Sequence, residues 1–323
     1  MAIDSTPHAS IHDAANQAGS FSFLPMKPAL SYDEQLQRIR ERGLIVSDEA
    51  KAISWLSDTN YYRIRGYWSA FEHDGTFMSG TALDDIMQAY QLDQGLRLWL
   101  WHAIGPIEIK ARTSLAYHLG MACGPLAHED PNNFISTAAH FRSVKGFMKE
   151  LERAKRNGVP CVVHNLNKYG DLPIWAAVEI MSMGTVSQMY GNLSNKAAYS
   201  DGTTVAKAVA RDFAIKQFHL KSWLRHLTYI RNLCGHHSRI YNRTMTTKAT
   251  LLKVDAAYDG PKTFPTVITL MRMYERLWPE KWIDMSHKLA SIVDTHSSVP
   301  IDPLGFPDDW ETIICNTQFR QRQ

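Results

Sequence analysis

The stretch KSWLRHLTYIRNLCGHHSRIYNR, residues 221–243, decides the predicted fold of this chain. An α-helix advances about 100° per residue, so apolar residues at helical spacing fall on one face. In this stretch the apolar stripe consists of Trp223, Leu227, Ile230, Cys234 and Tyr241. The pattern predicts a long amphipathic helix, part of a helical segment of about 204–243, whose stripe faces a core.

The opposite face of this predicted helix is polar and mostly cationic. Its members are Lys221, Arg225, Asn232, His236, Arg239 and Arg243. Arg231 lies on the flank and reaches this face through its long side chain. His236 lies in line with Asn232, one turn earlier, whereas His237 falls at the edge of the apolar stripe. If helical geometry continues through Gly235, His236 is the functional candidate and His237 a structural residue. A merely solvated basic face is the alternative interpretation.

The composition of the chain permits a sizeable core and indicates neither a disulfide framework nor a membrane span. Of 323 residues, 45% are hydrophobic, and 35 Lys and Arg against 32 Asp and Glu give a net charge of +3. That charge permits a nucleic-acid partner without indicating one. The four cysteines form no CxxC pair, and we expect a reducing, cytoplasmic compartment without disulfides. The apolar stretch 96–104 is too short to span a bilayer, so we expect no membrane partner.

Helical segments follow one another along the rest of the chain, and no strand alternation interrupts them. The predicted helices cover 32–42, 48–60, 84–119 with a break at Gly105 and Pro106, 141–156, 173–193, 204–243 and 263–296. The predicted organisation is a flexible tail at 1–24, a helical subdomain at 25–83, a helical domain at 84–300 and a C-terminal tail at 301–323. The predicted fold class is therefore all-α.

A segment rich in aromatic residues and arginine follows the second predicted helix. Tyr61, Tyr62, Arg63 and Arg65 are candidates for stacking on RNA bases and for holding phosphates. Aromatic packing in the core is the alternative interpretation, and it is favoured for a segment of this kind.

Several blocks of the chain, in this order, carry a resemblance to a known family. They are Lys27, Pro28 and Leu30; NYYR at 60–63 and GYW at 66–68; IEI at 107–109 with Arg112; LPIW at 172–175 with Glu179; GT at 184–185; WL at 223–224; YIRNLCGHHSR at 229–239; and NR at 242–243. The chain resembles abortive-infection proteins of the AbiD/AbiF type. Its Arg-Asn-x-x-x-His signature resembles the R-x(4–6)-H motif of the HEPN superfamily of helical ribonucleases. The motif alone is weak, but the ordered set of blocks is strong evidence.

This resemblance implies a HEPN-type helical bundle in a prokaryotic antiphage protein. It implies a homodimer in which both chains line one composite cleft, with Arg231, Asn232 and His236 at the motif positions. Proteins of this type can be paired with a structured non-coding RNA that acts as an antitoxin. RNA would then be both substrate and regulator.

The residue types at these positions predict metal-independent cleavage of RNA. The RNA 2′-hydroxyl would attack the adjacent phosphorus, with His236 as general acid or base. Arg231 would stabilise the charge that develops on the phosphoryl oxygens, and Asn232 would orient the histidine or the phosphate. We expect products with a 2′,3′-cyclic phosphate and a 5′-hydroxyl, and no cofactor.

Arg112 and His118 form a possible second motif of the same spacing. Glu108 precedes Arg112 by four residues, which predicts an ion pair within one helix. The favoured interpretation is that Arg112 is structural and His118 is incidental.

Other functions remain as alternatives to the nuclease. The same cationic stripe and aromatic residues can hold a structured RNA without cutting it, which describes a non-catalytic binding module or scaffold. A zinc site of Cys234, His236 and His237 lacks a fourth ligand at suitable spacing. Modification of Tyr241 by a partner enzyme is disfavoured, because this tyrosine lies on the predicted apolar stripe.

Overall fold

A single helix of 41 residues, α4 (Leu83–Cys123), forms the axis of the structure, a computed structural model that describes residues 26–315. At 1.5 Å per residue it is about 60 Å long. The backbone N–H of Ala82 donates to the Asp85 carboxylate at its start, and Gly124, with a φ of 93°, ends it. The helix continues through Pro106, where the sequence predicted a break. Packing of other helices along α4 offsets the backbone hydrogen bond that proline removes.

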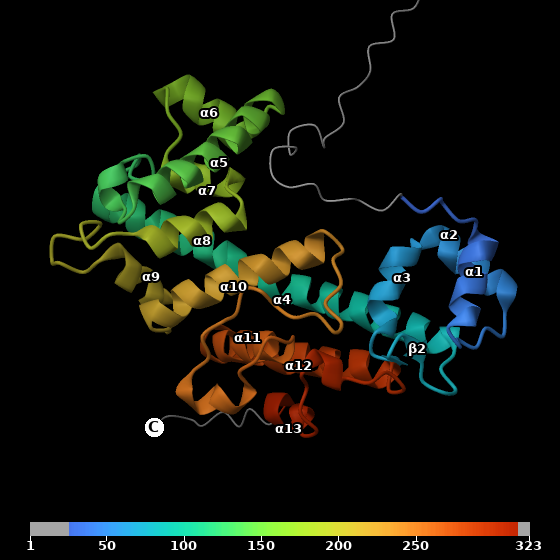
Figure 1. Ribbon diagram of the computed structural model, residues 1–323. Coiled ribbons are helices and arrows are strands. Elements are labelled where there is room, and N and C mark those ends of the chain that lie inside the picture. The colour runs from blue at the N-terminus through green and yellow to red at the C-terminus, as the bar shows by residue number, and fades with distance from the viewer. Residues whose placement is uncertain (1–25, 316–323) are drawn as a thin grey trace, which may run out of the picture.

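The other helices surround this axis (Figure 1). They are α1 (Tyr32–Glu41), α2 (Glu49–Asp58), α3 (Tyr61–Trp68), α5 (Thr137–Arg156), α6 (Pro160–Tyr169), α7 (Ile174–Ile180), α8 (Met183–Asn192), α9 (Val205–Asp212), α10 (Gln217–Gly235), α11 (Phe264–Leu277), α12 (Pro279–Thr295) and α13 (Trp310–Cys315). Short 3₁₀ helices are η1 (Pro131–Asn133), η2 (Lys253–Tyr258) and η3 (Asp302–Leu304). The predicted all-α fold class is confirmed.

Three groups of helices pack on different parts of α4. The first group, α1 to α3, lies at its N-terminal end beside the two-residue strands β1 (Glu72–His73) and β2 (Thr76–Phe77), which pair antiparallel (Figure 1). The helices α7 to α10 pack along its length, and α12 lies on another side. One contiguous core extends from Leu36 to Ile314. Ser31 caps the start of α1, because Ser31 and Glu34 form a reciprocal capping box.

Three predicted helices are each two helices in the structure. Between α7 and α8, Met181 is extended and Ser182 caps the new helix. Between α9 and α10, Ala214 adopts a left-handed φ of 51°. Between α11 and α12, Pro279 begins the second helix and has no N–H to donate. Helical periodicity crosses such short breaks, which is why the pattern did not reveal them.

Two further segments differ from the prediction. The helix α6 was not predicted, and residues 301–315 of the predicted C-terminal tail contain η3 and α13. Trp310 and Ile314 of α13 are buried against the core. The predicted N-terminal tail, 1–24, and residues 316–323 lie outside the described residues.

Candidate RNA-cleavage site

The end of α10 determines where the predicted motif lies. The apolar stripe is confirmed in the helix, since Trp223, Leu227, Ile230 and Cys234 are all buried. However, the helix ends at Gly235, so the predicted helix to residue 243 is wrong. Tyr241 is also buried, but it lies in the loop that follows the helix.

The last residue of the helix, Gly235, lies against Trp101 on α4. A Cβ atom at Gly235 would lie 2.9 Å from Cζ3 of the Trp101 ring, which is closer than real Cβ contacts allow. Glycine therefore permits a close approach of the two helices at this position. The helix terminus sits directly against an aromatic ring whose residue is 44% exposed.

The motif residues Arg231, Asn232 and His236 all lie at or near this helix terminus. Asn232 and His236 are exposed, and the N–H of His236 donates to the Asn232 carbonyl at 3.0 Å. The Arg231 guanidinium lies 4.8 Å from the centroid of the Trp101 ring. Its buried Nε is 3.5 Å from Oε2 of Glu108 and forms no hydrogen bond with the described residues. Arg231 and Glu108 thus form an ion pair, and the Arg231 side chain is 36% exposed.

The prediction that His237 faces the core is wrong. His237 is exposed and has a left-handed backbone with a φ of 53°. Because the helix has already ended, the 100° progression that placed this residue at the apolar stripe no longer applies. Its carbonyl oxygen accepts hydrogen bonds from Arg63 on α3 and, at 3.3 Å, from Arg97 on α4.

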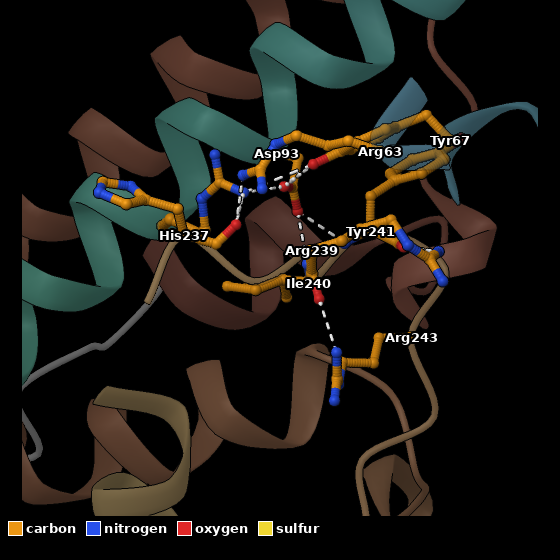
Figure 2. Close-up of polar contacts among 9 residues, drawn as sticks. Arg63, Tyr67, Asp93, His237, Arg239, Ile240, Tyr241 and Arg243 are labelled. Atoms are coloured by element: carbon orange, nitrogen blue, oxygen red, sulfur yellow. Dashed lines mark hydrogen bonds and ion pairs between the residues drawn. The ribbon is translucent and has the colours of Figure 1, made fainter. Parts of the chain in front are cut away.

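A buried carboxylate, Asp93 on α4, holds the loop after the motif (Figure 2). Its Oδ1 accepts hydrogen bonds from the backbone N–H groups of Ile240, at 2.8 Å, and Tyr241, at 2.7 Å. Its Oδ2 accepts from the hydroxyl of Tyr67 and from Nη1 of Arg97, both at 2.7 Å. A buried charge that is paired and accepts four hydrogen bonds is well satisfied.

This cluster fixes the backbone that carries His236. Figure 2 shows the ring of His237 pointing away from Asp93, while its carbonyl points toward the arginines. Burial raises the pKa of the Tyr67 hydroxyl, and the negative charge of Asp93 raises it further, so Tyr67 stays a proton donor. Sequence reasoning missed this cluster. The available signal was an aspartate and an arginine four residues apart in the apolar run LDQGLRLWL, 92–100.

A pocket of about 550 Å³ opens beside the helix terminus. Its lining residues are Arg63, Tyr90, Gln94, Arg97, Leu98, Trp101, Cys234, Gly235 and His237. These residues come from α3, α4 and the end of α10, and none of them is acidic. Burial raises the pKa of the Cys234 thiol to about 12, so it is neither a nucleophile nor a ready metal ligand near neutral pH.

Some of the candidate RNA-binding residues are exposed on helices, and the others pack against neighbours or hold a loop. Lys221 and Arg225 on α10, and Tyr62 and Arg65 on α3, are exposed. Tyr61 instead packs edge-on against Trp68 at 5.5 Å between ring centroids, as the core interpretation predicted.

Arg239 and Arg243 do not extend the cationic face of α10, because both lie in the following loop. The guanidinium of Arg239 donates to the carbonyl of Tyr241, and Nε of Arg243 donates to the Tyr229 hydroxyl at 3.3 Å. These contacts stabilise the loop. Arg63 both donates to the His237 carbonyl in this loop and lines the pocket.

The two residues of the possible second motif, Arg112 and His118, contact different partners. Arg112 pairs with Glu108 and donates to the carbonyls of Val178 and Met181, which end α7.

His118, by contrast, shares hydrogen bonds with the Tyr199 hydroxyl at 2.7 Å and with Asp212 Oδ2 at 3.0 Å. Both ring nitrogens of His118 therefore have hydrogen-bond partners. The 17 residues from Trp101 to His118 along α4 correspond to about 25 Å, so this cluster is separate from the motif at the end of α10.

Two alternatives from the sequence, a zinc site and modification of Tyr241, have weak support at this site. Within the part of the chain that the structure describes, no three His, Cys, Asp or Glu side chains are arranged to hold a metal ion. Tyr241 is buried, and its hydroxyl donates to the carbonyl of Pro300 at 2.9 Å, so a modifying enzyme could not reach it in the folded chain. No helix among residues 26–315 combines the length and the apolar character that crossing a membrane requires.

Comparison with known proteins gives one match. The model of the Abi-like protein family matches residues 54–242, more than half of the chain, a range that includes α3, α4 and the motif at the end of α10. No curated protein and no solved structure was found to match the chain. The chain belongs to the family of Abi-like proteins.

Proposed function

We propose that this protein is a metal-independent endoribonuclease of the AbiD/AbiF type, built on a HEPN bundle, that acts in abortive infection. Its membership in the Abi-like family indicates abortive infection, a defence against phage. The observation that carries the nuclease proposal is the position of Arg231, Asn232 and His236. All three lie at one helix terminus, beside a pocket lined by two arginines and no acid.

The chemistry assigns one task to each motif residue. His236 accepts the proton of the RNA 2′-hydroxyl as that oxygen attacks the adjacent phosphorus, and a histidine can do so near neutral pH. Arg231 donates two hydrogen bonds to the phosphoryl oxygens as negative charge develops there. The bond between phosphorus and the 5′-oxygen breaks, this oxygen takes a proton from water, and His236 releases its proton to the solvent. The products are a 2′,3′-cyclic phosphate and a 5′-hydroxyl.

A second copy of the chain completes this proposed site. Ile109 of α4 is a large apolar residue that is 66% exposed and lies outside the pocket lining, which favours its burial in an interface. A homodimer would bring Arg231 of one protomer toward His236 of the other across a two-fold axis. A structured non-coding RNA that binds the same cationic surface would inhibit the nuclease as an antitoxin.

The test is incubation of the purified protein with total cellular RNA in EDTA, followed by mapping of the RNA ends. We expect cleavage with cyclic phosphate ends by the wild type and by His287→Ala, which changes an exposed histidine on α12. We expect no cleavage by Arg231→Ala or His236→Ala. Equal cleavage by His236→Ala, or cleavage that EDTA abolishes, contradicts the proposal. If the wild type and His236→Ala both retain a discrete RNA without cleaving it, the result favours the non-catalytic binding module instead.

A further inference from the structure

We infer that the pocket at the end of α10 binds one unpaired nucleotide of RNA, with its base on Trp101 and its phosphate at Arg63. The inference rests on the proposed function only in taking the bound RNA as the substrate. It adds a specificity: the chain selects a nucleotide that is free of base pairing, next to the bond that it cuts.

The pocket has the size of a small-ligand site. Its volume of about 550 Å³ lies within the range of about 300–1,000 Å³ that is usual for such sites. It can accept one nucleotide, but a paired base inside a duplex cannot enter it. A base must therefore leave its stack, as bases in loops and bulges of RNA already do.

Trp101 provides the aromatic platform. Tryptophan is usually well buried, but this residue is 44% exposed and lines the pocket. The close contact with Gly235 and the Arg231 guanidinium 4.8 Å away hold the ring in place. A ring that is ordered before binding loses little entropy when a base stacks on it.

Arg63 provides the positive charge. Among residues 26–315 no carboxylate forms an ion pair with it, and its contacts are the His237 carbonyl and the face of Tyr90, 5.9 Å away. Arg97, in contrast, is neutralised by Asp93. With no acid in the lining, Arg63 gives the pocket a net positive charge that favours a phosphate group.

The position of the pocket links the base to the reaction. Gly235 and His237 both line it, and His236 lies between them in the chain. Trp101 lines the pocket, and the Arg231 guanidinium lies over its ring. A base on Trp101 therefore places a neighbouring phosphate within the reach of Arg231. Gln94, whose side-chain amide both donates and accepts, contacts the base edge.

The binding test uses RNA that cannot be cleaved. A fluorescent single-stranded RNA of mixed sequence, with fluorine in place of each 2′-hydroxyl, is titrated by anisotropy with four proteins. They are the wild type, Trp101→Ala, Trp101→Phe and, as a control, Tyr169→Ala, which removes an aromatic residue that is 61% exposed on α6 outside the pocket. Thermal unfolding confirms that each variant is folded.

We expect Trp101→Ala to weaken binding about tenfold or more, as loss of a base stack does. Trp101→Phe should stay within about threefold of the wild type, and Tyr169→Ala within about twofold. The same sequence as a duplex should bind more weakly than the single strand. Equal binding by Trp101→Ala, or no binding by the wild type, overturns the inference.

This test separates the inference from the proposed nuclease. If binding depends on Trp101 but unmodified RNA is not cleaved, the inference stands and the nuclease proposal fails. If unmodified RNA is cleaved, but Trp101→Ala changes neither the affinity nor the preference for unpaired sites, the nuclease stands and the inference fails.

Discussion

Asp93 on α4 accepts a hydrogen bond of 2.7 Å from the backbone N–H of Tyr241, which lies 148 residues later in the chain. The same carboxylate forms an ion pair with Arg97, and Arg97 in turn donates to the carbonyl of His237. The loop after the motif is therefore held by a charged group in the N-terminal third of α4, a helix of 41 residues. This contact joins the stability of the fold to the position of His236.

Asp93→Asn should lower the free energy of unfolding by about 3–5 kcal/mol, because it leaves the buried Arg97 without its counter-ion. Denaturant unfolding measures this loss. The control is Asp284→Asn, which breaks the exposed pair Asp284–Lys288 at the same spacing of four residues. Since exposed pairs contribute little, we expect a change below about 0.5 kcal/mol there. Similar losses in the two variants would contradict the role given to Asp93.

His237→Ala should leave the stability within about 0.5 kcal/mol of the wild type, because the side chain is exposed. This outcome is the opposite of what the helical count predicted. His237→Gly should stabilise the protein by up to about 1 kcal/mol, since glycine adopts a φ of 53° without steric cost. Thermal unfolding of both variants checks this. If His237→Ala lowered the free energy of unfolding by several kcal/mol, the side chain of His237 would belong to the core after all.

Arg112→Ala should lower the free energy of unfolding by about 3 kcal/mol, because it leaves Glu108 unpaired and the carbonyls of Val178 and Met181 without their donor. Arg225→Ala, which removes an exposed arginine from α10, should change it by less than about 0.5 kcal/mol. Denaturant unfolding compares the two. If Arg112→Ala is as stable as Arg225→Ala, and has lost all RNA cleavage, Arg112 belongs to an active site.

Acid should weaken the fold through His226. This residue is buried, its Nδ1 lies 2.7 Å from the Thr247 carbonyl and its Nε2 lies 2.9 Å from the Thr266 hydroxyl. Burial lowers the pKa of His226 to about 4. Below pH 6.5 the unfolded chain binds a proton on this ring while the folded chain does not, so stability falls from pH 6.5 to about 4 and then levels off.

The difference of about 2.5 pH units corresponds to about 3 kcal/mol for His226 alone. His226→Gln keeps one donor and one acceptor and cannot be protonated in this range, so it should flatten part of the pH dependence. Unfolding free energies at pH 7, 5.5 and 4 measure the effect. His287→Gln, at an exposed position, should leave the pH dependence as in the wild type. An unchanged slope in His226→Gln would show that other groups cause the acid sensitivity.

The sequence by itself determined the helical class, the buried stripe of α10 and the exposure of Lys221 and Arg225. The spacing of four residues also predicted the pairing of Glu108 with Arg112. Each of these depends on residues within one or two turns of the same helix, and periodicity reports such local relations. The motif residues were found in the same way, as a spacing within one segment.

Only the tertiary structure decided how the motif is presented. Gly235 ends α10 against Trp101, His237 turns outward, and Asp93 holds Tyr241. The pocket combines Arg63 with His237, which are 174 residues apart. No local pattern encodes such contacts, because they depend on how α3, α4 and the loop after α10 pack together. The packing of distant helices, and not helical periodicity, therefore sets the geometry of the candidate site.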